Sequence, residues 1–372
     1  MIVKICVLTS VHNAFDIRIF HKECKTLAKA GYDVTLIVQH DKDEVVDGIR
    51  IASLPRPKNK LERMTRTVWL AYRKAFKINA DIYHFHDPEL IPIGLLLKLH
   101  GKKVIYDVHE LVYFDLGDKK WLKYKFALRV IQILYYILEK ISVKTFDQLI
   151  LAEDGYLEYF KAEHGNIDKY LILQNFAVLS IIDGTEPLAA KKSKPILIYA
   201  GGLAETRGIR ELVKTMGIIK DKAELLLLGA WESKQLEDKC SSYSGWRHCR
   251  YLGFVPLREV YGHMKAADIG LAILSPVKNN LTSLLIKTFE YMACARPMVM
   301  SNFPIWMEVF SECAVFADPN DPNDIAEKIL YLLDHPEEAK RLGKRGRELV
   351  ETKYNWETES QKLIRFYEEL LK

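Results

Sequence analysis

Short apolar runs alternate with amphipathic stretches along almost the whole chain of 372 residues. Apolar runs of about four to eight residues are typical of buried strands, and the stretches between them have the length and periodicity of helices. In the first half we expect strands near residues 2–8, 33–38, 81–85, 103–107, 147–151 and 170–174. In the second half we expect them near residues 195–200, 224–228, 250–252, 268–273, 297–301 and 313–316. This alternation predicts a parallel α/β architecture.

A polar stretch with Gly and Pro and without periodicity separates the two halves. The chain is too long for one typical core and suits two domains of about 150 to 200 residues. We therefore expect an N-terminal domain over residues 1–182, a linker over 183–194 and a C-terminal domain over 195–354. The tail, residues 355–372, has the pattern of a further helix.

The composition is that of a soluble globular protein, with 49% hydrophobic and 28% charged residues. No apolar run reaches the roughly 18 residues of a membrane span, and the N-terminus runs directly into a strand pattern without a signal peptide. We therefore expect a cytoplasmic protein. The six cysteines form no CxxC pair, which indicates reduced, buried thiols and no structural zinc.

Residues 279–298 combine a polar stripe with an otherwise apolar helical pattern. Ser283, Lys287 and Glu290 are spaced i, i+4 and i+7, so they share one face of the predicted helix. Thr282 or Ser283 would cap the helix start, where unpaired N–H groups suit a phosphate, and Glu290 would lie about 11 Å further along. The stripe indicates a nucleotide diphosphate site. The alternative is a core helix with one satisfied carboxylate.

A second candidate phosphate site lies at the start of the C-terminal domain. A strand there is followed by Gly201 and Gly202, and Arg207 precedes a helix. Such turns bind phosphates, although a plain turn with a surface arginine has the same pattern. The chain has no GxGxxG motif, which argues against a dinucleotide-dependent oxidoreductase.

In the N-terminal domain, histidines and acids gather where predicted strands end. The first strand leads to His12, Asp16 and Arg18, and the later ones lead to His84, His86, Asp87, His109 and Glu110. Ligands of open α/β sheets bind at such ends, although a histidine there is more often a hydrogen-bonded structural group. His84, His86 and Asp87 are of the types that bind metals. Because no matching cluster completes a site in the sequence, we expect no metal.

The stretch Lys287, Phe289, Glu290, Tyr291, Met292, Ala293 and Pro297 resembles the donor helix of the retaining nucleotide-sugar glycosyltransferases of family 4. Residues 9–20, 199–208 and 251–255 resemble further motifs of that family, so the resemblance covers nearly the full chain. It implies a GT-B fold, in which two Rossmann-like doubly wound parallel-sheet domains face a cleft. It also implies that the last helix, 355–372, packs back on the first domain, and that transfer retains the anomeric configuration without a metal or cofactor.

The resemblance also implies roles for individual residues. Glu290 would hold the donor ribose, Arg207 and Lys287 would stabilise the diphosphate, and His109 would contact the transferred sugar. The remaining donor-side positions are Gly201, Gly202, Phe254, Val255, Thr282 and Ser283. Those expected toward the acceptor or the cleft are His12, Asp16, Arg18, His86, Asp87 and Glu110. The chain departs from the family pattern at Thr282, where many members have glutamate, at Gly202, often arginine, and at Ala295, usually glycine.

Positive charge is concentrated in two segments that also carry aromatic residues. Residues 56–77 carry a net charge of +7 and residues 119–140 carry +5, against +5 for the whole chain. This combination suits an anionic membrane surface, although each segment also fits a solvated helix face. No nucleic-acid-binding module is recognisable.

These features together predict a glycosyltransferase for polysaccharide biosynthesis, acting on a lipid-linked glycan or another cell-surface glycan precursor, peripheral on the inner face of the membrane. One alternative is a nucleotide-sugar epimerase or hydrolase of the same fold. Another is a catalytically weak, nucleotide-binding partner subunit, which Thr282 would favour.

Overall fold

A computed structural model describes residues 2–109, 111–112, 125–165, 168–188, 194–277, 280–281 and 283–372, with side chains from residue 128 in the helix that begins at Lys125. The chain divides into two compact units, which are Met1–Asn175 with Glu359–Lys372, and Phe176–Thr358. The first boundary lies earlier than the sequence suggests. Residues 176–182 belong to the second unit because the short helix α8 (Leu179–Asp183) packs on its core through Ile182.

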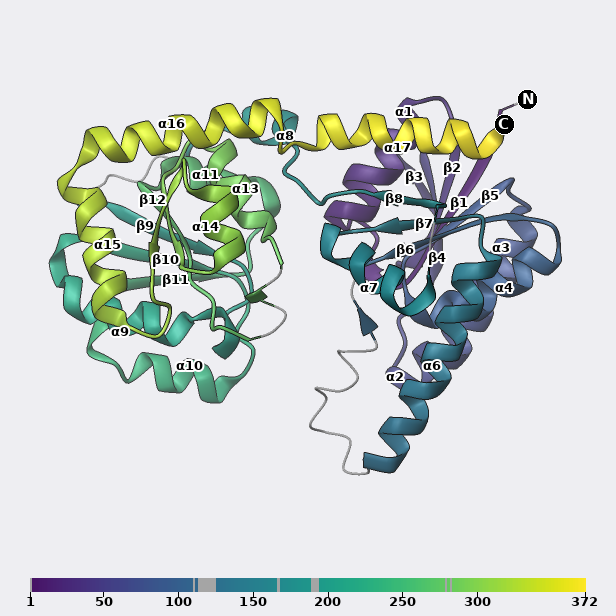
Figure 1. Ribbon diagram of the computed structural model, residues 1–372, viewed down its shortest axis with the longest axis horizontal. Helices are drawn as coiled ribbons and strands as arrows, with labels where there is room; N and C mark the ends of the chain where they lie inside the picture. Colours follow the sequence, from purple (N-terminus) through teal and green to yellow (C-terminus); the bar gives the residue numbers. More distant parts are fainter. Residues whose placement is uncertain are drawn as a thin grey trace. The chain divides into compact units, whose positions relative to one another are not determined.

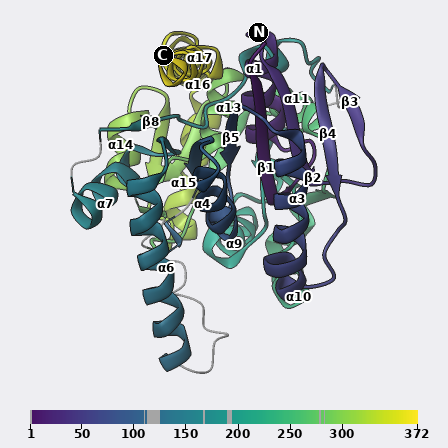
Figure 2. The ribbon, with the colours of Figure 1, turned by 90° about the vertical axis from the view of Figure 1, so that its right-hand side faces the viewer.

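The first unit is built on an eight-stranded sheet (Figures 1 and 2). Its strand order is β3-β4-β2-β1-β5-β6-β7-β8, and all neighbours are parallel except β3 and β4. The strands are β1 (Lys4–Asn13), β2 (Asp33–Gln39), β3 (Glu44–Val46), β4 (Ile49–Leu54), β5 (Ile82–Phe85), β6 (Lys103–Val108), β7 (Gln148–Leu151) and β8 (Tyr170–Ile172). The chain winds to one side of β1 through β2 and then to the other through β5. The carboxyl ends of β1 and β5 therefore flank the switch point at which ligands bind in such sheets.

Helices cover both faces of this sheet. They are η1 (Ile17–Cys24), α1 (Lys25–Lys29), α2 (Lys60–Glu62), η2 (Arg63–Thr67), α3 (Val68–Ile78), η3 (Pro88–Leu90), α4 (Ile91–Leu99), α6 (Lys125–Thr145), α7 (Asp154–His164) and α17 (Trp356–Leu371). Figure 2 shows α3, α4 and α6 in front of the sheet, where they share one core. From Glu359 onward α17 belongs to this first unit, and its Tyr367 is buried there.

The second unit has a six-stranded, fully parallel sheet of order β11-β10-β9-β12-β13-β14. Its strands are β9 (Ile196–Ala200), β10 (Glu224–Leu228), β11 (Cys249–Gly253), β12 (Ile269–Ala272), β13 (Met298–Ser301) and β14 (Ala314–Ala317). The order reverses between β9 and β12, as in a doubly wound nucleotide-binding fold. Together the two sheets confirm the predicted fold class.

Side chains alternate across the second sheet because successive residues of a strand point to opposite faces. Ile196, Ile198 and Ala200 of β9 join one core, whereas Leu197 and Tyr199 join the other. The helices of this unit, besides α8, are η4 (Glu205–Arg207), α9 (Ile209–Ile219), η5 (Lys220–Lys222), α10 (Lys234–Ser241), η6 (Ser244–His248), α11 (Leu257–Ala266), α13 (Ile286–Ala293), α14 (Pro304–Phe310), α15 (Pro322–Asp334) and α16 (Pro336–Thr352). The apolar strand runs are therefore buried on both faces, which explains why they read as continuous in the sequence.

The cysteines agree with the sequence prediction. All six are unpaired, and only Cys249 is partly exposed.

Candidate functional site

In the first unit, the turn after β1 is fixed by a carboxylate from the neighbouring strand. Asp87 follows β5, and its Oδ2 accepts hydrogen bonds from the Thr9 hydroxyl at 2.8 Å and from the Ser10 N–H at 2.6 Å. The sequence places Asp87 on the acceptor side, whereas the structure buries it, with 3% of the residue exposed. Its role here is to hold the loop that carries His12.

His12 and Asp16 form a pair at the partly exposed rim of this loop. His12 Nδ1 lies 3.3 Å from Asp16 Oδ2, and His12 Nε2 lies 3.7 Å from Asp87 Oδ1. Asp16 also caps η1 by accepting hydrogen bonds from the N–H groups of Arg18 and Ile19, both at 2.9 Å. Burial lowers the pKa of His12, but the hydrogen bond with Asp16 and the charge of Asp87 outweigh burial and raise the pKa above its usual value.

Arg18 is buried inside the unit, which corrects the sequence prediction that it faces the acceptor or the cleft. Its guanidinium contacts both oxygens of Asp107 at 3.0 Å and donates to the Leu173 carbonyl at 3.0 Å. Only 5% of its side chain is exposed. Burial would raise the pKa of Asp107, but Arg18 and then His109 hold it well below its usual value.

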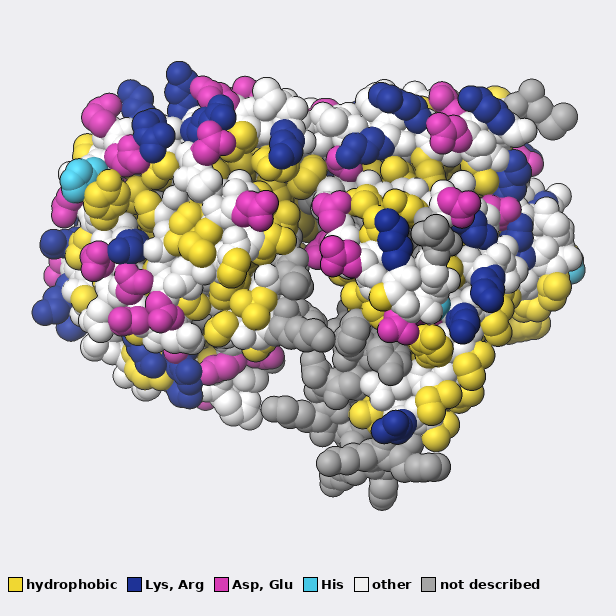
Figure 3. All heavy atoms as spheres, in the orientation of Figure 1, with side chains coloured by type: hydrophobic (Ala, Val, Ile, Leu, Met, Phe, Trp, Pro, Cys, Tyr) yellow, Lys and Arg dark blue, Asp and Glu magenta, His cyan; other side chains and the backbone are white. Residues whose placement is uncertain are grey.

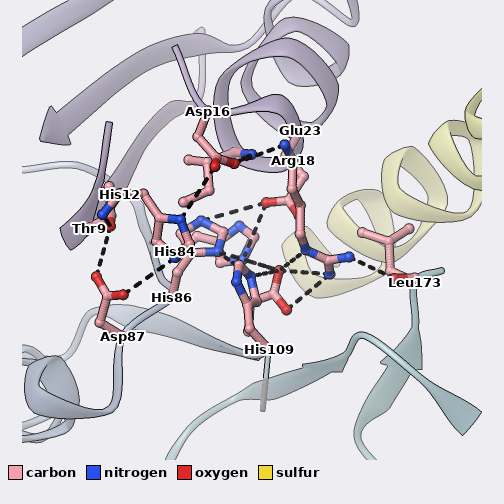
Figure 4. A network of polar contacts seen from close by, with 12 residues as sticks. Thr9, His12, Asp16, Arg18, Glu23, His84, His86, Asp87, His109 and Leu173 are labelled. Atoms are coloured by element: carbon pink, nitrogen blue, oxygen red, sulfur yellow. Dashed lines mark hydrogen bonds and ion pairs between the residues drawn. The ribbon is translucent and has the colours of Figure 1, made fainter. Parts of the chain in front are cut away.

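His109 follows β6 and is the most exposed of the three histidines at the ends of β5 and β6 (Figure 4). Its Nε2 lies 3.1 Å from His86 Nδ1 and 3.4 Å from Asp107 Oδ2, and 19% of its side chain is exposed. The structure buries His86 beneath His109, so His86 does not line a surface as the sequence suggests. His12 and His109 meet edge to face, with ring centroids 5.5 Å apart. Glu110 lies outside the described residues.

In the second unit, two strand ends meet in a tight glycine turn. Gly201 follows β9 and Gly229 follows β10, both with φ of +138°. A Cβ on Gly229 would lie only 1.9 Å from the Gly201 carbonyl oxygen, so a side chain there would force the two loops apart. Gly202 comes next and is exposed. The Gly201 N–H donates to the Leu228 carbonyl at 2.9 Å, so this turn is held by backbone hydrogen bonds. Phosphate binding by Gly201 and Gly202 stays a prediction.

Lys287, in the first turn of α13, places a cation beside this glycine turn. Its Nζ lies 3.6 Å from the centroid of the Tyr199 ring, and a Cβ on Gly201 would lie 3.0 Å from the same Nζ. Lys287 is buried, and its ammonium has no hydrogen-bond acceptor among the described residues. Burial and then the charge of Arg207 hold the pKa of Lys287 well below its usual value. An anion placed here would supply what the ammonium lacks.

Glu290 lies one turn further along the buried face of α13. It is 8% exposed, and its Oε1 accepts a hydrogen bond from the Tyr261 hydroxyl at 2.9 Å. Arg207 ends η4 in a half-buried position, and Gly208 follows it with φ of +64°. Lys287, Glu290 and Arg207 therefore share one edge of the second sheet, which the sequence spacing indicates for the first two.

The start of the donor helix differs from the prediction. α13 begins at Ile286, after Leu285 in an extended conformation with ψ of 133°. Ser283 therefore precedes the helix and is not part of its stripe, and its carbonyl accepts a hydrogen bond from Trp306 Nε1 at 2.8 Å. The N-cap position is Leu285, so Ser283 is not the cap, and Thr282 lies outside the described residues.

The turn after β11 lies beside the glycine turn. The Gly253 carbonyl accepts a hydrogen bond from the Gly229 N–H at 2.8 Å. Val255 packs on the core of the unit, whereas Phe254 is 86% exposed. Contact of these two residues with a nucleotide base stays a prediction.

Family models match both halves of the chain. Residues 18–169 match the model described as "Glycosyltransferase Family 4", and residues 184–349 match "Glycosyl transferases group 1". The chain belongs to the GT-B glycosyltransferases. A curated relative, an uncharacterized glycosyltransferase from Methanocaldococcus jannaschii, is 35% identical over 83 residues. That match spans 22% of this chain and 23% of the relative.

Solved structures share the fold of this glycosyltransferase over its whole length. Sucrose-phosphate synthase from Thermosynechococcus elongatus aligns with a TM-score of 0.78 at 20% identity, covering 99% of each chain. Anabaena HepE in complex with UDP-glucose aligns at 0.73 and 11% identity, covering 98% of this chain and 99% of HepE. An Escherichia coli protein bound with UDP-2-fluoro glucose aligns at 0.72 and 13% identity, covering 99% of this chain and 98% of that protein.

Three residues of the second-unit site escape the sequence prediction, namely Tyr199, Gly229 and Tyr261. Gly229 had a signal, because a glycine directly after a strand of four leucines marks a turn at the sheet edge. Tyr199 and Tyr261 resemble ordinary core aromatics in the sequence, and only the tertiary structure places them against Lys287 and Glu290.

Proposed function

We propose that this glycosyltransferase moves a sugar from a nucleoside diphosphate sugar to an acceptor, with retention of the anomeric configuration. The observation that carries the proposal is the Lys287 ammonium, which is buried beside the Gly201 turn without an acceptor among the described residues. A buried polar group without a partner costs stability, and a charged group costs more, so such a site is suited to a bound anion. The bound UDP-sugars of HepE and of the E. coli protein make uridine nucleotides the first donors to test.

The site supports the chemistry in the following way. As the bond between the sugar C1 and the phosphate oxygen breaks, negative charge grows on the diphosphate, and Lys287 and Arg207 would stabilise it. The acceptor oxygen forms the new bond to C1 on the same face. Its proton passes to the departing phosphate oxygen, so charge and atoms balance. Two cationic side chains would supply the positive charge that a divalent ion could otherwise provide, so we propose transfer without a metal at the donor.

Product analysis tests the proposed function. The full-length protein would be incubated with UDP-, GDP- and ADP-sugars, with and without lipid-linked glycan acceptors, in the presence of a chelator. We expect a glycosylated acceptor that depends on one donor and has the anomeric configuration of that donor. An altered sugar formed without acceptor would indicate an epimerase, and free sugar would indicate a hydrolase. Nucleotide binding without any product would indicate a binding subunit.

We further propose that the acceptor is lipid-linked and that the first unit docks on an anionic membrane. Six aliphatic side chains of α6 are exposed, namely Val130, Ile131, Ile133, Leu134, Ile137 and Ile141. Four of them, at 130, 134, 137 and 141, follow the spacing of one helix face. Figure 3 shows hydrophobic side chains along the edge of the unit where Figure 1 draws α6.

α3, which α4 separates from α6, also carries exposed aromatic residues. Trp69 is 57% exposed and Phe76 is 54% exposed, among the basic residues of the segment 56–77. Tyr135 of α6 turns inward and donates a hydrogen bond to Glu139 Oε1 at 3.0 Å. Three lysines of the basic segment 119–140, namely Lys119, Lys120 and Lys123, lie outside the described residues. Within the described ranges, no helix is both long enough and apolar enough to cross a bilayer.

A further inference from the structure

Four metal-ligating side chains converge inside the first unit. They are Glu23 from η1, His84 from β5, His86 from the end of β5 and Asp107 from β6 (Figure 4). One potential ligand atom from each lies within 4.8 Å of those of the other three, and all four residues are buried. The sequence argument against a metal considered His84, His86 and Asp87. The structure removes Asp87 from that set and adds Glu23 and Asp107.

The fold explains why these residues meet. β5 and β6 are parallel neighbours in which His84 pairs with Ile105 and Phe85 with Tyr106. The same register places Asp107 beside His86. Positions two apart share a face of the sheet. η1 is a π-helix, in which residues i and i+5 lie together, and it brings Glu23 to Arg18, with 3.0 Å between Glu23 Oε1 and Arg18 Nε.

The atoms that face one another in this cluster are poorly satisfied. Nε2 of His84, Nε2 of His86 and Glu23 Oε2 are buried and form no hydrogen bond within the described part of the chain, whereas Glu23 Oε1 is paired with Arg18 Nε at 3.0 Å. Buried polar atoms are almost always hydrogen-bonded, so three such atoms around one point need an explanation. A cation bound between them would satisfy the two nitrogens and the carboxylate together.

The opposite nitrogen of each histidine already has a partner. His84 Nδ1 lies 2.8 Å from the Tyr367 hydroxyl, and His86 Nδ1 lies 3.1 Å from His109 Nε2. Metal-binding histidines characteristically have their second nitrogen hydrogen-bonded, which fixes the ring and aims the other nitrogen at the ion. Both Nε2 atoms are therefore the natural ligand atoms.

From these observations we propose that Glu23, His84, His86 and Asp107 bind one divalent transition-metal ion of the zinc class. His86 Nε2 is 3.5 Å from Glu23 Oε2, and His84 Nε2 is 3.7 Å from Asp107 Oδ2. Ligands about 2.1 Å from a tetrahedral centre are roughly 3.4 Å apart, so small side-chain shifts close the site. Two imidazoles with two carboxylates favour zinc, cobalt or nickel over magnesium or calcium.

Arg18 sets the charge balance of the site. It contacts both oxygens of Asp107, including the Oδ2 that faces the histidines, and also pairs with Glu23, so it compensates one of the two carboxylates. The other carboxylate is balanced by the cation or, without it, by a proton. The site lies beneath His109 in the first unit, whereas the proposed diphosphate ligands are in the second unit. The proposal is therefore independent of the proposed transfer reaction.

Metal titration of the full-length protein tests the proposal. The protein would be stripped with a chelator, dialysed separately against zinc, cobalt, nickel and manganese, and analysed for bound metal by mass spectrometry. We expect one metal per chain, visible absorption of tetrahedral cobalt and a raised melting temperature. If the stripped wild-type protein takes up none of zinc, cobalt, nickel or manganese, the proposal is wrong and a proton completes the cluster.

Two variants locate the metal. Glu23→Gln removes a charged ligand atom without changing its shape, and we expect it to abolish stoichiometric zinc binding. Tyr367→Phe keeps all four ligands but releases His84 Nδ1, and we expect roughly tenfold to hundredfold weaker binding. His335→Gln in the second unit is the matched control and should bind as the wild type does. Unchanged zinc affinity in folded Glu23→Gln and Tyr367→Phe proteins would place the ion elsewhere and overturn the proposal.

Discussion

At the scale of single residues, Lys287 carries the clearest energetic conflict. Burial of the side chain favours the neutral amine over the ammonium, so the pKa of Lys287 in the folded protein lies well below the 10.5 of an ordinary lysine. Between these two pKa values the unfolded chain binds more protons, and stability therefore rises with pH across that interval. We expect Lys287→Met to raise the free energy of unfolding of the ligand-free protein by about 1 kcal/mol near neutral pH.

Denaturant unfolding measured over a range of pH checks this expectation. The difference between Lys287→Met and the wild type should shrink as the pH approaches 10.5. The exposed Lys239→Met on α10 serves as the control, because it removes a lysine without removing a buried charge. A Lys287→Met protein that is less stable than the wild type at neutral pH would show that the lysine is satisfied without a ligand.

Glu290 is expected to bind the donor rather than stabilise the fold. Glu290→Gln keeps the shape of the side chain but loses charge-assisted hydrogen bonds to the ribose hydroxyls, which should weaken nucleotide binding by about 1.5 to 3 kcal/mol. Calorimetric titration of the preferred nucleotide measures this loss, and Glu308→Gln on the exposed face of α14 is the control. Equal affinities in the wild type and in Glu290→Gln would remove Glu290 from the site.

Ala295 explains a departure from the family pattern in physical terms. It follows α13 with φ of +53°, and the hydrogen bonds from Ala295 N–H to Met292 and from Arg296 N–H to Tyr291 complete a Schellman motif. A Cβ in this left-handed conformation costs about 1 to 2 kcal/mol, partly offset by the greater freedom of an unfolded glycine. Thermal unfolding should therefore show that Ala295→Gly is more stable, by up to about 1 kcal/mol, whereas Ala293→Gly inside the helix is less stable. A destabilised Ala295→Gly would mean that the Ala295 methyl group makes packing contacts worth more than the strain.

At the scale of elements, the exposed face of α6 leads to a membrane prediction. Replacing Leu134, Ile137 and Ile141 with Ser should reduce co-sedimentation with anionic vesicles about tenfold or more, because each side chain contributes apolar area to the interface. Nucleotide affinity should be unchanged, since the donor residues are in the second unit. Serines at Ile218 and Met307, which are similarly exposed in the second unit, provide the control. If the wild type stays in the supernatant even at low salt, a soluble acceptor becomes the better proposal.

The same scale shows which elements the sequence could and could not predict. The parallel strands were predictable because burial on both faces leaves continuous apolar runs. The hairpin of β3 and β4 was missed although Asp47 and Gly48, both with positive φ, are the signal of a tight hairpin turn. Glu23 was missed because a helical wheel of 3.6 residues per turn separates it from Arg18, whereas the π-helix η1 brings the two together.

The location of the other predicted site residues depends on tertiary packing, which the sequence pattern does not show. Ser283 has the spacing of the donor stripe, but Leu285 is extended and α13 begins only at Ile286. Arg18 follows a strand end as a ligand-binding arginine would. Only the tertiary structure shows that its guanidinium is already hydrogen-bonded to Asp107. By contrast, Lys287 and Glu290 were predictable because an i, i+3 pair on a short buried helix keeps its spacing in any surroundings.

At the scale of the whole molecule, we propose that one unit binds the donor and the other binds the acceptor and the membrane. The second unit contributes Lys287, Arg207 and Glu290 for the donor. The first contributes His109, His12 and the surface of α6 for the acceptor and the membrane. This division explains why the donor chemistry can be tested without knowing the acceptor.

The most direct measurement is calorimetric titration of the full-length protein with UDP, GDP and ADP and with the matching monophosphates, repeated in buffers of different ionisation enthalpy. We predict that one diphosphate binds more tightly than its monophosphate and that its binding takes up a proton, because the bound anion raises the pKa of Lys287 that burial holds low. Lys287→Met should abolish this proton uptake. If none of the three diphosphates binds, or if one binds without proton uptake and equally well to Lys287→Met, the proposed donor site is wrong.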